Sequence, residues 1–356
     1  GPLHYLASFL QLTKENNVAI ISFGKNSSQF TNGRHTARLF NTEKFNSKLV
    51  SNFLKFLYTS CFLIYYKPDR ILCATINNPA LWSAWFVSKV YRIQFVHTRH
   101  AQVKSLLLPW HKRFLHSFEN LFVKRAYKVI CHGPFLEKQL LAIGVKKEKL
   151  IRFEVKYDEF ISNLDLRPQK LDFLFGKEYI LYVGRMIKDK GIFDLLNAFI
   201  NTFKQNEIYL VYVGDGPDLE LLKEMIKENS LEKRIIVLGD VEHNLIASIM
   251  KNSKCIVVPT KSILGEGRPQ VVMEGLVAGK PVIAPAFGSF YYLIEHKING
   301  LLYQKDSLFS LQEALSLIIK DDMLYKSLEE GALRSGIEIN NYPVTYDKAI
   351  QSAFIT

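Results

Sequence analysis

The sixteen residues from Gly265 to Lys280 constrain the fold of this chain more than any other stretch. They lie between two short apolar runs, 255–259 and 281–284, that predict strands. Pro269 suits the first position of a helix, where its missing N–H costs nothing, and Gly279 suits the residue after the helix end. The stretch therefore predicts a strand, a loop, a helix with one face packed on a sheet, and a second strand.

Two carboxylates mark this stretch. Glu266 precedes the predicted helix, and Glu274 lies eight positions further on, inside it. A helix N-terminus offers unpaired N–H groups and a partial positive charge, which favour phosphate binding. A nucleotide-sugar could place its diphosphate at this helix end, its sugar near Glu266 and its ribose near Glu274. For a bare pair at this spacing, a solvated loop glutamate and a helix-surface glutamate are the simpler alternative.

The setting of these glutamates is more specific than their spacing. The pattern Gly-Glu-Gly-x-Pro-x-x-x-x-Glu-Gly-x-x-x-Gly-Lys-Pro-Val-Ile-Ala resembles the signature of family 4 retaining glycosyltransferases of GT-B fold. The resemblance implies that Glu266 contacts the transferred sugar and Glu274 the ribose hydroxyls. It places Gly267, Arg268 and Pro269 among the donor-binding residues. Arg268 departs from the family, which usually has an apolar or aromatic residue there.

A second motif follows a predicted strand at 179–185. Arg185 and Lys190 flank one loop, where two cations can neutralise a diphosphate, most of all as it becomes a leaving group. A basic surface turn is the alternative. Gly-Arg-x₄-Lys-Gly resembles the family's diphosphate-binding element, so Gly184, Arg185 and Lys190 are expected to bind the donor, with both cations catalytic. By the same resemblance Val241 lies against the base and Gly288 contacts the donor.

Predicted strands and helices alternate along the chain, which favours two parallel sheets of Rossmann type. Ligands of such sheets bind beyond the carboxyl ends of the strands. The predicted strands lie at about 18–22, 35–40, 70–74, 93–97, 126–133, 179–185, 208–213, 235–238, 255–259, 281–284 and 299–302. The predicted helices include those at about 3–12, 46–66, 79–90 and 134–143, one that starts at Pro269, and others from Leu308 onward.

Two polar loops are expected at strand ends of the first half. One contains Asn77, and the other, 97–100, contains Arg99 and His100. A histidine can bind a sugar hydroxyl or shuttle a proton near neutral pH, although an ordinary basic loop fits equally well. By resemblance His100 touches the donor sugar or the acceptor, with Arg99 beside it. Family members begin with a strand and a glycine loop, so we interpret Gly1 as the trace of that loop.

The domain organisation expected from this resemblance is GT-B, with two Rossmann-like domains facing across a cleft. Residues 1–165 form the acceptor-side domain, whose first strand is missing from the sequence as given, and 166–341 form the nucleotide-sugar domain. Residues 342–356 cross back to the first domain. The segment 161–177 is expected to be the linker. The chain contains no Asp-x-Asp, which disfavours the metal-dependent glycosyltransferases of the other common fold.

Charge is unevenly distributed. Residues 1–168 hold 25 Lys and Arg against 10 Asp and Glu, whereas residues 169–356 hold 21 against 24. The basic half suggests an anionic partner, and a membrane surface or lipid phosphate is favoured over nucleic acid, for which no motif is present. Residues 106–116 mix bulky apolar and basic side chains, typical of a membrane interface or of an amphipathic helix on its own domain.

The apolar stretches and the cysteines indicate the cellular compartment. No stretch of eighteen uncharged apolar residues occurs, so no transmembrane helix is predicted. The four cysteines lie in apolar segments without metal-ligand spacing and are predicted to be buried thiols in a reducing compartment. The protein is therefore expected in the cytoplasm, with peripheral association with the inner face of the membrane as an option.

The function implied by the resemblance is a retaining, metal-independent transfer without a cofactor. A sugar would move from a nucleotide donor, UDP- or GDP-linked, to a glycan or lipid-linked acceptor. Assembly of cell-surface polysaccharide, lipopolysaccharide or glycolipid is the expected setting. Two alternatives stay open: a nucleotide-sugar epimerase on the same fold, and a non-catalytic subunit that binds nucleotide-sugars.

Overall fold

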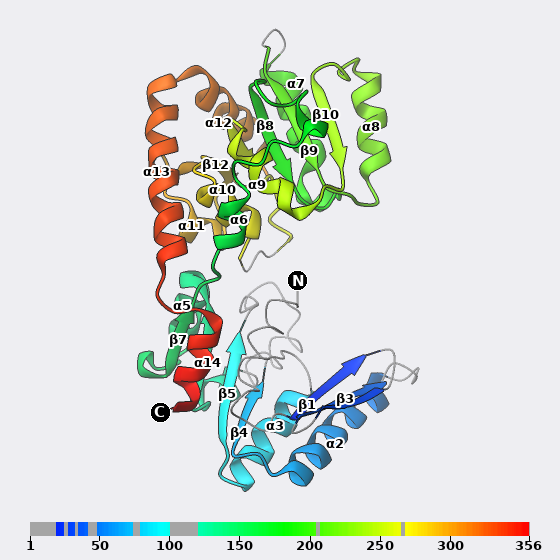
Figure 1. The fold of residues 1–356 in the computed structure, drawn as a ribbon, viewed down its shortest axis with the longest axis vertical. Coiled ribbons are helices and arrows are strands. Elements are labelled where there is room, and N and C mark those ends of the chain that lie inside the picture. The colour runs from blue at the N-terminus through cyan, green and yellow to red at the C-terminus, as the bar shows by residue number, and fades with distance from the viewer. Residues whose placement is uncertain are drawn as a thin grey trace. The chain divides into compact units, whose positions relative to one another are not determined.

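The structure is a computed structural model, and it divides into two compact units (Figure 1). Unit 1 comprises Gly1–Glu154 and Pro343–Thr356, and unit 2 comprises Val155–Tyr342. The residues that the structure describes are 19–24, 28–32, 35–41, 48–73, 79–99, 120–203, 207–264 and 268–355.

Unit 2 is built on a six-stranded sheet whose order is β10-β9-β8-β11-β12-β13, with every pair parallel. The strands are β8 (Tyr179–Val183), β9 (Tyr209–Val213), β10 (Ile235–Gly239), β11 (Cys255–Val257), β12 (Val282–Pro285) and β13 (Gly300–Tyr303). The helices are α6 (Asp158–Ser162), α7 (Ile192–Thr202), α8 (Leu219–Glu228), α9 (His243–Lys251), α10 (Gln270–Val277), α11 (Phe290–Leu293), α12 (Leu308–Lys320) and α13 (Asp322–Asn341).

Helices cover both faces of this sheet, which explains why its strands are nearly continuous apolar runs. Successive side chains of a strand point to opposite faces. Ile180 and Tyr182 of β8 accordingly pack in the core formed with α7, α8 and α12. Tyr179 and Leu181 pack in the core formed with α9 and α10. The segment 161–177, which we expected to be a linker, contributes Leu171 and Leu174 to this second core.

Unit 1 contains a four-stranded parallel sheet of order β4-β5-β6-β7. Its strands are β4 (Arg70–Cys73), β5 (Gln94–Arg99), β6 (Lys128–His132) and β7 (Leu150–Phe153). Its named helices are α2 (Lys48–Tyr66), α3 (Pro79–Val90), α5 (Gly133–Ala142) and α14 (Tyr346–Ile355). Tyr346, Ala349 and Ile350 of α14 pack with Val96 and Phe153 of the sheet.

A separate sheet in unit 1 differs from the prediction of one parallel sheet. Its order is β1-β3-β2, from β1 (Ala19–Gly24), β2 (Ser28–Asn32) and β3 (His35–Asn41). The strands β1 and β3 pair in parallel, as expected, but β2 pairs antiparallel with β3 and was not predicted. Only two residues connect β2 to β3, and the Asn-Gly at 32–33 is a hairpin signal that could have revealed it.

Burial of the cysteines is as predicted at three of the four positions. Cys73, Cys131 and Cys255 are buried, and desolvation raises the pKa of the Cys131 and Cys255 thiols to about 12. Cys61 is exposed, which corrects the prediction, because it lies on the outer side of α2 while Phe62 and Leu63 enter the core. Among the described helices, none is both long and apolar enough to cross a membrane.

Candidate functional site

The strand order of unit 2 reverses at one place. From β8 the chain proceeds outward through β9 to β10, whereas β11, β12 and β13 extend in the opposite direction. Ligands of open parallel sheets bind beyond the strand carboxyl ends at such a switch point. Here it lies between β8 and β11, and the loops that follow these two strands contain Arg185, Lys190 and Arg268.

The two loops at the switch point are joined backbone to backbone. Gly191, which ends the loop after β8, has φ 76°, and a Cβ there would lie 2.0 Å from the carbonyl oxygen of Pro259. The N–H of Lys261 donates to the carbonyl of Asp189 over 3.0 Å. Only glycine permits this approach, so the last residue of Gly-Arg-x₄-Lys-Gly fixes one loop against the other.

The loop after β8 is fixed on its other side by the loop after β9. The N–H of Gly184 donates to Val213 over 3.0 Å, and that of Met186 donates to Asp215 over 2.9 Å. A Cβ on Gly214, whose φ is 129°, would lie 2.0 Å from the carbonyl oxygen of Gly184. The backbone that carries Arg185 is therefore held by neighbours on both sides.

The two predicted phosphate-binding cations emerge from this fixed loop. Arg185 is exposed, and its carbonyl accepts a hydrogen bond from the buried Tyr182 hydroxyl over 2.8 Å. Lys190 is half-buried at the end of a 3-10 turn, Lys188–Lys190. The N–H of Lys188 donates to the carboxylate of Asp218 over 2.7 Å. The strand edge thus presents two cations from a rigid backbone.

Helix α10 begins at Gln270, one residue later than predicted. Pro269 is the N-cap residue, with φ −69° and ψ 106°, and its carbonyl accepts from the N–H of Val272 over 3.1 Å. The N–H groups of Gln270 and Val271 have no acceptor within the helix, as at any helix start. Gly279, at φ 71°, ends the helix as predicted.

Glu274 is buried within α10, with 6% of its surface exposed. This excludes the alternative of a solvated helix-surface glutamate. Desolvation raises the pKa of the Glu274 carboxyl above its ordinary value, while nearby His243 and a hydrogen bond with Gln270 act in the opposite direction. Packing therefore fixes the position of this carboxylate.

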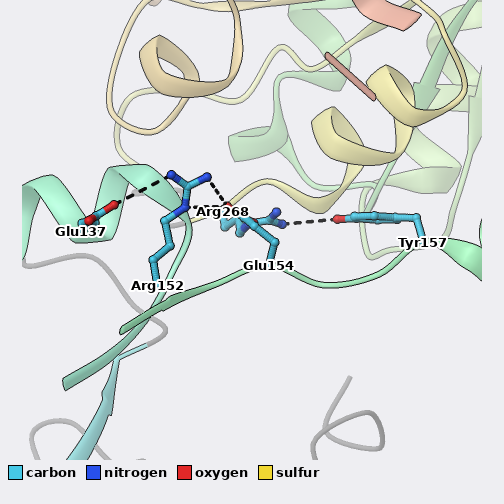
Figure 2. A network of polar contacts seen from close by, with 5 residues as sticks. All are labelled: Glu137, Arg152, Glu154, Tyr157 and Arg268. Atoms are coloured by element: carbon cyan, nitrogen blue, oxygen red, sulfur yellow. Dashed lines mark hydrogen bonds and ion pairs between the residues drawn. The ribbon is translucent and has the colours of Figure 1, made fainter. Parts of the chain in front are cut away.

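Arg268 and Gln270 share an acceptor that sequence reasoning did not find. The hydroxyl of Tyr157 accepts from Arg268 Nη1 over 3.3 Å and from Gln270 Nε2 over 3.0 Å. Figure 2 shows the Tyr157 ring aimed at the Arg268 guanidinium. Tyr157 is itself buried, and its N–H donates to the side-chain oxygen of Asn340 over 2.8 Å. The unusual arginine at position 268 was the signal, since a half-buried guanidinium has several N–H donors that require acceptors.

Within unit 1, Arg99 lies at the carboxyl end of β5. The predicted strand ended at His97, but β5 continues to Arg99, so this residue belongs to the strand and not to a loop. Arg99 is 1% exposed, and it stands opposite Cys131 in the register of β5 with β6. On β6, the ring of His132 stacks on Phe153 with centroids 4.6 Å apart.

A further ion-pair cluster at this edge of unit 1 was not anticipated. Arg152 Nη2 lies 3.0 Å from Glu154 Oε1, and Arg152 Nη1 lies 3.9 Å from Glu137 Oε2 (Figure 2). Glu154 is 4% exposed. The three residues come from β7, from the residue after it and from α5, so no spacing in the sequence marks them.

Two further predicted site residues, Val241 and Gly288, lie in unit 2. Val241 follows β10 and packs against the core, and Gly288, at φ 57°, lies between β12 and α11. Five predicted site residues fall outside the described residues, and their roles stay predictions. These are Gly1, Asn77, His100, Glu266 and Gly267.

A protein-family profile matches the part of the chain that contains both motifs. Residues 166–334 match the family profile described as glycosyl transferases group 1. The match includes the loops at the switch point and α10, and it ends within α13.

Comparison with curated proteins finds relatives of the same kind. An uncharacterised glycosyltransferase of Methanocaldococcus jannaschii is 29% identical over 203 residues, covering 57% of this chain and 52% of that protein. Alpha-monoglucosyldiacylglycerol synthase of Streptococcus pneumoniae is 26% identical over 288 residues, covering 74% of this chain and 62% of that protein. The matched segments thus span about half to three fifths of these relatives.

Comparison with solved structures extends over nearly the whole chain. HepE of Anabaena, in complex with UDP and glucose, aligns with a TM-score of 0.64 at 18% identity. The alignment covers 91% of this chain and 97% of that one. At this identity the likeness establishes the fold.

Proposed function

We propose that this chain, which belongs to the glycosyl transferases group 1 by the match of residues 166–334, transfers a sugar from a nucleotide-sugar to an acceptor. Its two units with parallel sheets have the GT-B fold. The observation that carries the proposal is the meeting of both donor motifs at the switch point of unit 2. HepE was solved with UDP, which favours a UDP-linked donor here over a GDP-linked one.

The donor is proposed to lie along the carboxyl edge of unit 2. Arg185, Lys190 and the N-terminus of α10 hold the diphosphate, because fixed positive groups act there without reorganisation. Glu274 accepts the ribose hydroxyls, and Val241 lies against the base. Glu266, with Gly267 beside it, contacts the sugar.

The reaction is proposed to retain the anomeric configuration without a metal. The bond between the anomeric carbon and the β-phosphate oxygen breaks, and its electron pair goes to that oxygen. The acceptor hydroxyl attacks the same face of the sugar, and its proton passes to the departing phosphate. Arg185 and Lys190 stabilise the charge that builds up on this leaving group.

Unit 1 is proposed to take the acceptor. Its basic charge and the mixed segment 106–116 favour a glycan or lipid-linked acceptor at the cytoplasmic face of an anionic membrane. The relative from Streptococcus pneumoniae is named for a glucosylated diacylglycerol, which supports a lipid. His100, Arg99, Asn77 and Gly1 are the proposed contacts with acceptor or sugar.

The proposal is tested by thermal shift followed by transfer. Ligands that bind the folded state raise its melting temperature, so UDP should stabilise the protein. Labelled UDP-sugars are then incubated with a membrane lipid extract, and the anomer of any product is read by NMR. A product of inverted configuration would refute retention. Consumption of donor without any acceptor would indicate the epimerase, and binding without turnover in any extract would indicate the non-catalytic subunit.

A further inference from the structure

A basic cavity of about 600 Å³ lies at the amino edge of the four-stranded sheet of unit 1. Residues before or at the starts of β5, β6 and β7 line it. A strand rises about 3.3 Å per residue, so Gln94 at the start of β5 lies roughly 16 Å from Arg99 at its end. The cavity is therefore at the opposite edge from the proposed acceptor contact.

Five cations and one carboxylate line this cavity. They are Lys89, Arg92, Arg125, Lys128, Lys149 and Glu148. Two of the cations serve the fold: Lys149 Nζ donates to the carbonyl of Ala126 over 2.9 Å, and Lys128 Nζ donates to that of Glu148 over 3.1 Å. Lys89, Arg92 and Arg125 are exposed and form no ion pair with any carboxylate in the described part of the chain. Three positive charges thus lack a countercharge.

Arg92 has a backbone conformation that is unfavourable for a residue with a Cβ. The N–H of Ile93 donates to the carbonyl of Ser88 over 2.8 Å, which places Arg92 at the left-handed position after α3, with φ 56°. Glycine is usual at that position because a Cβ is strained there. Strain of this kind points to a role for the side chain beyond the helix cap.

Gln94 adds a polar group to the cavity. Its Oε1 is buried and has no hydrogen-bond partner among the described residues. An unpaired buried carbonyl costs free energy, which a ligand with an O–H donor would recover. The ligand therefore combines negative charge for the cations with at least one hydrogen-bond donor, such as a hydroxyl.

The last turns of α3 expose apolar side chains beside the cavity. Phe86, Val90 and Tyr91 are 56%, 58% and 51% exposed. Phe86 and Val90 are four residues apart and share one side of the helix. Lys89 and Arg92 flank Val90 and Tyr91 in the chain. Aromatic and apolar side chains mixed with cations are typical of a bilayer interface, whereas a small soluble anion would leave them in water.

We propose that this cavity binds the phosphate headgroup of an anionic lipid that carries headgroup hydroxyls. Lys89, Arg92 and Arg125 contact the phosphate, and Gln94 accepts a headgroup hydroxyl. Phe86, Val90 and Tyr91 lie in the interface. The site holds a lipid of the bilayer itself, whether or not the chain transfers a sugar, so it stands apart from the proposed function.

Vesicle flotation of the full chain without any donor tests the proposal. Vesicles are made of phosphatidylcholine with or without phosphatidylglycerol, whose headgroup supplies both phosphate and hydroxyls. The wild type should float only with phosphatidylglycerol. Arg92→Gly should weaken binding roughly fivefold, and adding Arg125→Gln should weaken it about as much again, since each basic residue contributes separately near an anionic surface.

The controls distinguish specific binding in the cavity from nonspecific attraction between positive charge and the vesicle. Arg92→Gly should melt no lower than wild type, because glycine suits φ 56°, so weakened binding would not reflect misfolding. Lys67→Gln/Lys147→Gln removes two exposed charges of unit 1 that do not line the cavity, and it should retain most binding. Lys146 is left unchanged because it forms an ion pair with Glu148 of the cavity. An equal loss in this control would overturn the proposal. Stabilisation by soluble glycerol 3-phosphate without vesicle binding would assign the cavity to a soluble phosphate and also overturn it.

Discussion

The side-chain amide of Gln270 donates a hydrogen bond to the hydroxyl of Tyr157 over 3.0 Å, across 113 positions of sequence. The same hydroxyl accepts from Arg268 over 3.3 Å. The start of α10 is thereby tied to the first residues of unit 2. This contact fixes the end of the helix that is proposed to bind the donor diphosphate.

Tyr157→Phe should destabilise unit 2, because it removes the acceptor that Arg268 and Gln270 share. Arg268 is half-buried and Gln270 is exposed, so the expected cost is that of ordinary hydrogen bonds, about 0.5–1.5 kcal/mol each. For a unit of this size the melting temperature should fall by about 2–4 °C per kcal/mol, measured by calorimetry. Tyr291→Phe, at a residue 58% exposed, is the matched control and should change nothing. Equal effects in both variants would contradict a structural role for this hydroxyl.

Lys190→Ala should weaken UDP binding, because it removes a proposed charge-assisted contact with the diphosphate. The expected loss is roughly 1.5–3 kcal/mol, measured by titration calorimetry. Lys188→Ala removes an exposed cation from the same turn and should have a much smaller effect. If both variants lost affinity equally, general positive charge would account for binding and the assignment of Lys190 would be wrong.

Substitutions of the two glutamates of the signature should affect different steps. Glu266→Ala should reduce turnover strongly and leave UDP affinity nearly intact, because Glu266 is proposed to act on the sugar. Glu274→Ala should weaken UDP binding through loss of the ribose contact. Both variants are measured in the transfer assay and by calorimetry. Identical behaviour in the two assays would refute this division of roles.

Stability should depend on pH through Glu274. Burial raises the pKa of the folded-state carboxyl above its ordinary value of 4.5, so the folded protein binds more protons than the unfolded chain between these two values. The contribution of this protonation to the free energy of unfolding is therefore fully present below about pH 4.5, and it is lost as the pH rises through the folded-state pKa. Glu274→Gln lacks this titration. The melting temperature of the variant relative to wild type should increase with pH, and a difference that is constant with pH would refute it.

The sequence alone determined the local units of the structure and the residue types of the two motifs proposed to bind the donor. Continuous apolar runs such as 179–183 correctly predicted strands buried on both faces. In the described part of the chain most predicted strands and helices are present, with boundaries shifted by a few residues. Gly279 was interpreted correctly as the residue after the helix end, because a positive φ angle depends on residue type. These features are short-range, so the chain encodes them within a few positions.

Tertiary structure decided the features that depend on distant partners. Strand order placed β8 beside β11 and so created the switch point, which no local pattern reports. Packing buried Glu274 and exposed Cys61, although both lie in helices with apolar neighbours. Arg268 found its acceptor in Tyr157, 111 positions away. Burial and hydrogen-bond partners are set by which surfaces meet when the chain closes long loops, and that cannot be inferred from spacing along one sequence.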